Sequence, residues 1–240
     1  ALCALVGLLA LTGYLLYYFA PEGVRAPLGW LHSATGLAVL LACAVGLPLG
    51  ITLGHLHWGG ALAINISNIG RAVPTLGVVI LFAVSPVGAG TVGIALALAL
   101  FALPPVLTNA YVGMREVDPE AVEAARGMGM SRVQVIGRVE LPLASPLIAA
   151  GVRSAVLQVL ATAVLAAAVG GGGFGRFLID GLGSQDYPQL QAGAVLVAGL
   201  AFAVELLLAG LQRLGDPVAR QRRVLRRPSR RSAAAEAGRR

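Results

Sequence analysis

The chain has 240 residues, of which 57% are hydrophobic and only 12% are charged, and its formal net charge is +7 at pH 7. Its mean hydropathy is +0.81. Soluble domains carry about twice this share of charged residues, so the composition excludes a soluble globule and favours a membrane protein.

Six apolar segments approach the length of about 20 residues that a membrane-spanning helix needs. They cover residues 1–19, 34–54, 61–85, 91–112, 147–169 and 190–211. Pro48, Pro74 and the Pro104-Pro105 pair fall inside these segments, where neighbouring helices can satisfy the carbonyl groups that proline leaves free. The sequence therefore predicts an all-α, polytopic membrane protein with about six transmembrane helices.

The first segment, 1–19, has no basic residue before it and no convincing cleavage site, so we expect a retained helix and not a signal peptide. Residues 1–27 are then a helix with an external loop, residues 28–213 the main membrane domain, and residues 214–240 a tail. Cys3 and Cys43 lie in apolar segments, with neither disulfide nor metal spacing.

The basic residues predict the topology. All eighteen are Arg, and ten of them lie between Arg213 and Arg240, which places the tail in the cytoplasm by the positive-inside rule. Counting back through six helices puts the N-terminus and the loop 113–146, with its four Arg, on the same side and leaves Arg25 and Arg176 outside. A basic tail of this kind predicts contact with anionic lipid in preference to nucleic acid.

His55 and His57 lie beside Trp58 in a short turn, residues 54–60. Two histidines with one residue between them can touch a metal ion, but no third ligand is near in sequence. An interfacial turn anchored by Trp58 is the better interpretation, and no metal site is predicted.

The loop 113–146 contains the signals for two short helices. Asp118 suits an N-cap, Pro119 the first helical position and Glu120 the first turn. Gly127 and Gly129 are expected to stop this helix after about Arg126. Ser131 and Gln134 form a capping-box pattern for a second helix, which should end before Pro142. Alanines keep the first helix slim enough for another surface to approach its backbone: Ala121, Ala124 and Ala125.

Polar residues within the apolar segments fall on helical faces, because they recur every three or four positions. They either hydrogen-bond helix to helix or line a path for a solute. Arg71 and Glu205 are the costliest to bury and therefore the most suggestive of function, while Arg153 can extend to the interface. The candidates for a path are Asn68, Arg71, Thr75, Asn109, Ser154, Gln158 and Thr162.

The glycine run 170–173, with Gly175, resembles a phosphate-binding loop only superficially. Such a loop needs a Lys to reach the phosphates, and the chain has no Lys. The run is expected to form a tight turn before an external, lid-like segment that extends to Pro188.

One pattern within the loop identifies a family resemblance. Glu123-Ala124-Ala125, Gly129, Val139 and Leu141-Pro142 stand at the spacing of the signature loop of binding-protein-dependent ABC importer permeases, with Val139 where that family usually has Ile. The resemblance implies a type I importer fold in which this loop fits a groove on a cytoplasmic ATPase. The coupling residues would be Glu120, Ala121, Glu123, Ala124, Ala125, Arg126, Gly127, Gly129, Leu141 and Pro142.

A finer resemblance, over about residues 34–212, is to the permeases for glycine betaine, choline and carnitine. It rests on residues 71–77, 103–111, 117–130 and 170–175, while the first helix and the Arg tail fall outside the usual pattern. It implies a bacterial inner-membrane subunit that pairs with itself or a homologous permease, with ATPase subunits below and a binding protein outside. The chain would be no enzyme and bind no cofactor, since the ATPase uses the ATP.

The cargo is less constrained than the family. Quaternary ammonium groups are commonly held in aromatic cages, yet only 5% of residues are aromatic and no cage-like cluster appears. This fits a path for a substrate that the external binding protein selects. Two alternatives stay open: an importer for another cargo, such as an amino acid or a metal ion, and a helical channel or scaffold that needs no ATP.

Overall fold

The computed structural model describes residues 22–60, 65, 72–88 and 90–215. Every regular element in these ranges is helical. In chain order the elements are α2 (Glu22–His55), α4 (Thr75–Val84), α5 (Thr91–Arg115), α6 (Pro119–Gly127), α7 (Arg132–Val135), the π turn η1 (Ile136–Glu140), α8 (Leu141–Ala166), the 3-10 turn η2 (Ala167–Val169), α9 (Gly175–Gly183) and α10 (Tyr187–Gly215).

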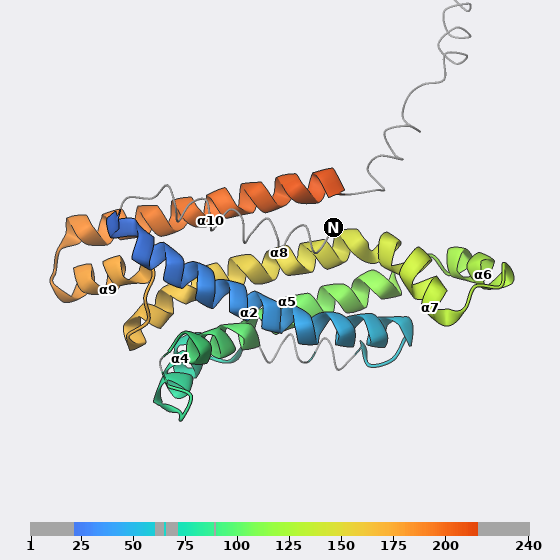
Figure 1. Ribbon diagram of the computed structural model, residues 1–240, viewed down its shortest axis with the longest axis horizontal. Coiled ribbons are helices and arrows are strands. Elements are labelled where there is room, and N and C mark those ends of the chain that lie inside the picture. The colour runs from blue at the N-terminus through green and yellow to red at the C-terminus, as the bar shows by residue number, and fades with distance from the viewer. Residues whose placement is uncertain (1–21, 61–64, 66–71, 89, 216–240) are drawn as a thin grey trace, which may run out of the picture.

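Four long helices, α2, α5, α8 and α10, run lengthwise through the molecule (Figure 1). The short helices α6 and α7 lie at one end of this bundle, and α9 lies at the other. Helix α5 contacts both α2 and α8, while α10 contacts α8 and α9. The bundle therefore has α5 at its centre and α10 at its edge.

Burial confirms this arrangement. In the most apolar part of α5, 61% of the residues are buried inside the protein, whereas the figure for α10 is 6%. The exposed side chains of α10 are nonetheless apolar, among them Val195, Phe202 and Leu206. A helix that is apolar all round suits a lipid environment and not water.

Glycines allow α2 to lie directly on α5. A Cβ atom at Gly50 would come within 2.6 Å of the Ala110 Cβ and 2.7 Å of the Leu107 carbonyl oxygen, and one at Gly54 within 2.6 Å of the Met114 Cβ. These two glycines are one helical turn apart, so they lie on the same face of α2. Such close backbone approach is the usual way in which helices associate inside membranes.

Among the described residues, four helices are long and apolar enough to cross a membrane: Ala34–His55, Thr91–Arg115, Arg132–Val169 and Tyr187–Gln212. They correspond to the predicted segments 34–54, 91–112, 147–169 and 190–211. The predicted segment 1–19 lies outside the described residues, as does much of the first half of 61–85.

The predicted segment 61–85 was expected to stay helical through Pro74, but its helix is interrupted at Val73 and Pro74. Pro74 does not lie inside a helix but precedes α4 with an extended backbone (ψ 113°), and Val73 before it is not helical. A residue that precedes proline is sterically disfavoured in the α conformation, which explains the break. Helix α4 itself has only 10 residues.

The start of α2 also differs from the expected loop. This helix begins at Glu22 and runs for 34 residues, so the end of the predicted 1–27 segment is helical. Extending an existing helix fixes one residue per new hydrogen bond and avoids the cost of a new nucleus. In agreement with the prediction, Pro48, Pro104 and Pro105 lie inside helices.

We expect Gly50→Ala to destabilise the bundle by about 1–3 kcal/mol, because the added methyl group overlaps α5 backbone that cannot easily move. Gly36→Ala on the same helix is the control, since a Cβ atom there meets nothing within 4 Å. Thermal unfolding of the purified protein in detergent measures both. Equal melting temperatures for the two variants would contradict the close α2–α5 contact.

Candidate functional site

The N-terminus of α6 is capped as the sequence predicts. The Asp118 side chain accepts a hydrogen bond from the Glu120 backbone N–H at 2.9 Å, and Pro119 occupies the first turn. Carboxylates there also interact favourably with the positive end of the helix dipole. A nine-residue helix thus begins at a fixed point next to the end of α5.

The C-terminus of α6 ends in a left-handed glycine. Gly129 has φ +81°, its N–H donates to the Arg126 carbonyl, and the Met130 N–H donates to the Ala125 carbonyl. This pair of bonds is the Schellman motif. Gly127 is the last helical residue, so the turn depends on Gly129.

The second short helix opens as predicted but continues past the expected stop. The Ser131 side chain accepts from the Gln134 N–H, and the Ser131 N–H donates to the Gln134 side chain at 2.8 Å. The predicted end before Pro142 is wrong. Instead η1 leads directly into α8, which has Pro142 in its first turn.

The π turn explains why Pro142 does not break the chain path. In an uninterrupted α-helix its ring would clash with the carbonyl four residues earlier. In η1 the Leu141 N–H donates to the Ile136 carbonyl, one residue further back than in an α-helix, and this widens the turn. One turn later, the Ser145 hydroxyl donates to the Pro142 carbonyl at 2.8 Å. This bond replaces the one that residue 146 would donate in an α-helix, because Pro146 has no backbone N–H.

One face of α6 is anchored to the bundle. Ala125 is buried, and the half-buried Val122 packs on an apolar cluster that Leu141 also contacts. The cluster consists of Ala110, Met114, Val117, Ala144 and Ile148. Of the three predicted alanines, Ala125 thus faces its own chain, Ala121 is half-buried and only Ala124 is exposed. The exposed residues of the predicted coupling set are Glu120, Glu123, Ala124, Arg126, Gly127, Gly129 and Pro142.

A buried polar contact that sequence reasoning missed joins α2 to this region. The Nδ1 atom of His55 lies 2.7 Å from Oε2 of Glu140, with 12% and 5% of the two side chains exposed. The two residues are 85 positions apart, so no local pattern links them. The signal in the sequence was slight: a carboxylate directly before Leu141-Pro142. The neighbouring residue His57 has φ +54°, and its Nδ1 donates a hydrogen bond to the His55 carbonyl, as expected in a turn.

Five of the seven path candidates lie within the described residues: Thr75, Asn109, Ser154, Gln158 and Thr162. Asn68 and Arg71 lie outside the described residues, and Thr75 is half-buried at the start of α4. The Asn109 side chain donates to the Pro105 carbonyl at 2.8 Å and lies where α8 crosses closely, since a Cβ atom at Gly151 would be 2.6 Å from the Asn109 Cβ.

The predicted stripe on α8 divides into two environments. Ser154 and Gln158 are exposed, whereas Thr162 is buried and donates its hydroxyl hydrogen to the Gln158 carbonyl at 2.8 Å. Ser154 and Gln158 therefore lie on a face of α8 that the described part of this protomer leaves uncovered.

Charged side chains fasten α10 to α8. Nε of Arg153 lies 3.6 Å from Oε2 of Glu205, and another guanidinium nitrogen donates to the Gln212 side chain at 3.1 Å. Gln212 in turn donates to the Pro146 carbonyl. The Glu205 oxygen makes no hydrogen bond, so its contact with Arg153 is an ion pair only. The cost of burying Glu205 in a membrane helix suggests a function, but its pairing with Arg153 gives it a structural partner.

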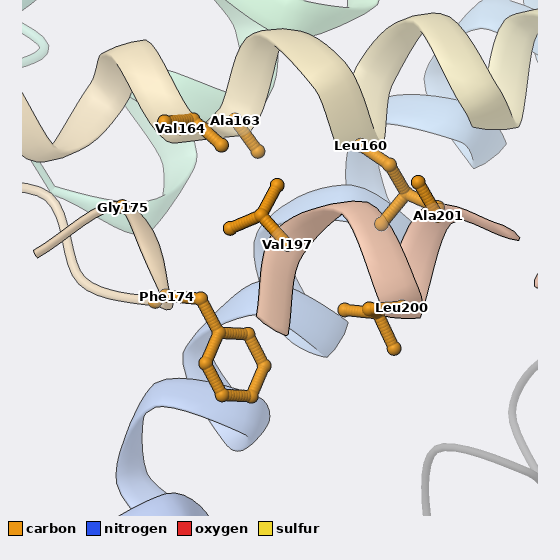
Figure 2. Close-up of a pocket in the computed structure, with 9 residues that line it drawn as sticks. Leu160, Ala163, Val164, Phe174, Gly175, Val197, Leu200 and Ala201 are labelled. Atoms are coloured by element: carbon orange, nitrogen blue, oxygen red, sulfur yellow. The ribbon is translucent and has the colours of Figure 1, made fainter. Parts of the chain in front are cut away.

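The glycine run forms the predicted tight turn, with Gly170 and Gly173 at φ values above +80°. Beside it lies a pocket between α8 and α10, and Phe174 is one of the residues that line it (Figure 2). The pocket is lined by Leu160, Ala163, Val164, Gly173, Phe174, Gly175, Val197, Leu200 and Ala201. None has a polar side chain, so this pocket offers no recognition of a polar solute. Within the described ranges, no three His, Cys, Asp or Glu residues are grouped to hold a metal ion.

Solved structures share the fold. The inward-facing MetNI methionine ABC transporter aligns with a TM-score of 0.68 at 20% identity, over 80% of this chain and 94% of that one. An amino acid ABC transporter with histidines aligns with a TM-score of 0.61 at 21% identity, over 87% and 96%.

Sequence relatives are more similar. The choline transport system permease protein OpuBB of Bacillus subtilis is 35% identical over 78% of this chain and 85% of its own length. The carnitine transport permease protein OpuCB of Listeria monocytogenes is 36% identical over 76% and 84%. The family model for inner membrane components of binding-protein-dependent transport systems matches residues 46–221. With the exposed, doubly capped α6 at the signature loop and an all-helical fold shared with ABC importers, the chain belongs to this family of transport permeases.

Proposed function

We propose that this chain forms the translocation path of an ATP-driven importer for a small osmoprotectant such as glycine betaine, choline or carnitine. An external binding protein delivers the substrate, a second permease copy or a homologous permease completes the path, and a separate cytoplasmic ATPase hydrolyses the ATP. The observation that carries the proposal is α6, a short helix with one face anchored in the bundle and the other presented outward.

The outward face of α6 has the form that a docking element needs. Ala124 is small and exposed, so a groove can approach the helix backbone there. Glu123 and Arg126 beside it are exposed charges, which contribute little to affinity but fix orientation. Because Val122 packs on the apolar cluster of α5 and α8, a push on α6 would displace the ends of these helices as well.

The osmoprotectant cargo is supported by the relatives, which are described as choline and carnitine permeases at 35% and 36% identity. The similarity to methionine and amino acid transporters, at 20% and 21% identity, concerns the fold alone. An amino acid or a metal ion is therefore the second candidate cargo. A channel without ATP is disfavoured, because it would have no use for an anchored coupling helix.

We further propose that both termini and the loop 113–146 lie in the cytoplasm. This orientation places the four Arg of the loop and ten Arg of the tail inside, in accord with the positive-inside rule. It also places α9, at the opposite end of the bundle, on the side of the binding protein.

The coupling role predicts that Ala124→Trp abolishes uptake while the protein still reaches the membrane. The bulky ring blocks close approach of a groove, so ATP hydrolysis should no longer respond to loaded binding protein. Ala203→Trp on α10, at another exposed alanine, is the matched control and should transport normally. Uptake by vesicles that contain the complex, together with ATPase assays, measures both variants.

A second pair of variants isolates the turn behind α6. Added Cβ atoms at Gly127 and Gly129 both meet nothing within 4 Å, but only Gly129 has a positive φ. Gly129→Ala should cost about 1–2 kcal/mol at this turn and impair coupling, whereas Gly127→Ala should not. Full ATP-coupled uptake by both Ala124→Trp and Gly129→Ala would remove the coupling role from α6.

The topology predicts selective labelling of single cysteines in a variant that has Cys3 and Cys43 replaced by alanine. Val133 is strongly exposed on α7, so Val133→Cys should react with an impermeant maleimide only after the cells are opened. Ser184→Cys, which follows α9, should react in intact cells. Labelling of Val133→Cys in intact cells would show that the loop lies outside, which would contradict the proposed orientation.

The cargo assignment predicts uptake of radiolabelled choline or glycine betaine by a host that lacks its own osmoprotectant importers, when the chain is expressed with its ATPase and binding protein. Unlabelled carnitine should compete, and methionine should not. Uptake of methionine in place of choline would support the proposed importer and overturn the proposed cargo.

A further inference from the structure

The last residue of α2 and the last residue of the π turn are held together by a buried contact. His55 ends α2, Glu140 ends η1, and their side chains meet at 2.7 Å. Glu140 is 4% exposed, and among the described residues it is the one charged residue that is buried. The pair thus connects the end of one long helix to the short segment between α6 and α8.

Stability alone does not account for this pair. A carboxylate that leaves water loses solvation that its partner only partly restores, and two apolar residues of similar size are often at least as stable. A short polar contact differs from an apolar one in direction and register, because it fixes two particular atoms to each other. The pair is therefore better suited to holding a position than to adding stability.

The surroundings show what the pair holds in position. Gly54, next to His55, lies against Met114 of α5, and Met114 belongs to the apolar cluster under α6. Leu141, next to Glu140, packs on the same cluster. The ends of α2 and α5 and the start of α8 therefore meet around the apolar cluster on which Val122 of α6 packs, and the His55–Glu140 contact joins α2 to the start of α8.

We propose that His55 and Glu140 are positioning residues for coupling: they transmit displacement of α6 to α2, so that the path responds to the ATPase. The apolar cluster links α6 to α5 and α8, but apolar contacts do not fix one register between helices. The His55–Glu140 contact ties α2 to η1 at one register, and π turns recur at functional sites. This inference rests on the proposed coupling role of α6 and adds α2 to the moving unit.

The test compares ATP hydrolysis with transport in the assembled importer, reconstituted with its ATPase and binding protein and supplied with choline or glycine betaine. His55→Ala and Glu140→Ala should each lower uptake and binding-protein-stimulated ATPase activity about tenfold, while ATPase subunits still co-purify. The double variant should be no worse than either single one, because the two side chains act as one contact. His57→Ala, an exposed neighbour, is the control and should couple normally.

An apolar pair separates positioning from simple fastening. The double variant His55→Leu with Glu140→Leu removes the buried charge and should retain or raise the melting temperature, yet it should remain uncoupled. The exchanged pair, His55→Glu with Glu140→His, should recover uptake. Full coupling by the apolar pair, or by both single alanine variants, would overturn the inference. If Ala124→Trp uncouples in the same assay, the proposed function stands and only the role of the pair fails; if Ala124→Trp is also normal, the function of α6 fails with it.

Discussion

The contact of α5 with α2 on one side and α8 on the other is the constraint on which the rest of this structure depends. Inside lipid no hydrophobic force drives helices together, so close packing and a few polar contacts must do so. Gly50 and Gly54 bring α2 onto α5, and Gly151 brings α8 onto α5 near Asn109. Three helices fixed at this separation bring their ends together, and α6 packs there through Val122.

Prolines shape the α8 side of this assembly without interrupting it. Pro142 and Pro146 each remove a backbone hydrogen bond, yet the helical path from Arg132 to Val169 is continuous. The π turn accommodates the first proline, and the Ser145 hydroxyl replaces the bond lost at the second. Helix α7 therefore joins the long helix α8 without a loop between them.

The sequence predicted those features that depend on residues within about four positions of each other. The Asp118 cap, the Gly129 turn and the Ser131–Gln134 capping box are of this kind. Prediction failed for features that depend on backbone geometry or on residues far apart in the chain. The π turn at Pro142 requires knowledge of the backbone, and the His55–Glu140 contact joins distant segments. A four-residue spacing placed Ser154, Gln158 and Thr162 on one face, but only packing decides that Thr162 is covered and the other two are exposed.

The distribution of charge among the long helices bears on how a path would treat its cargo. Arg153 and Glu205 are paired with each other between α8 and α10, so they hold helices together and are not free for a solute. Ser154 and Gln158, the exposed polar residues of α8, are neutral. Where Ser154 and Gln158 face a path, these neutral groups would bind a quaternary ammonium weakly, and passage requires binding weak enough to be released. Tight selection would then belong to the external binding protein, whose affinity the permease need not match.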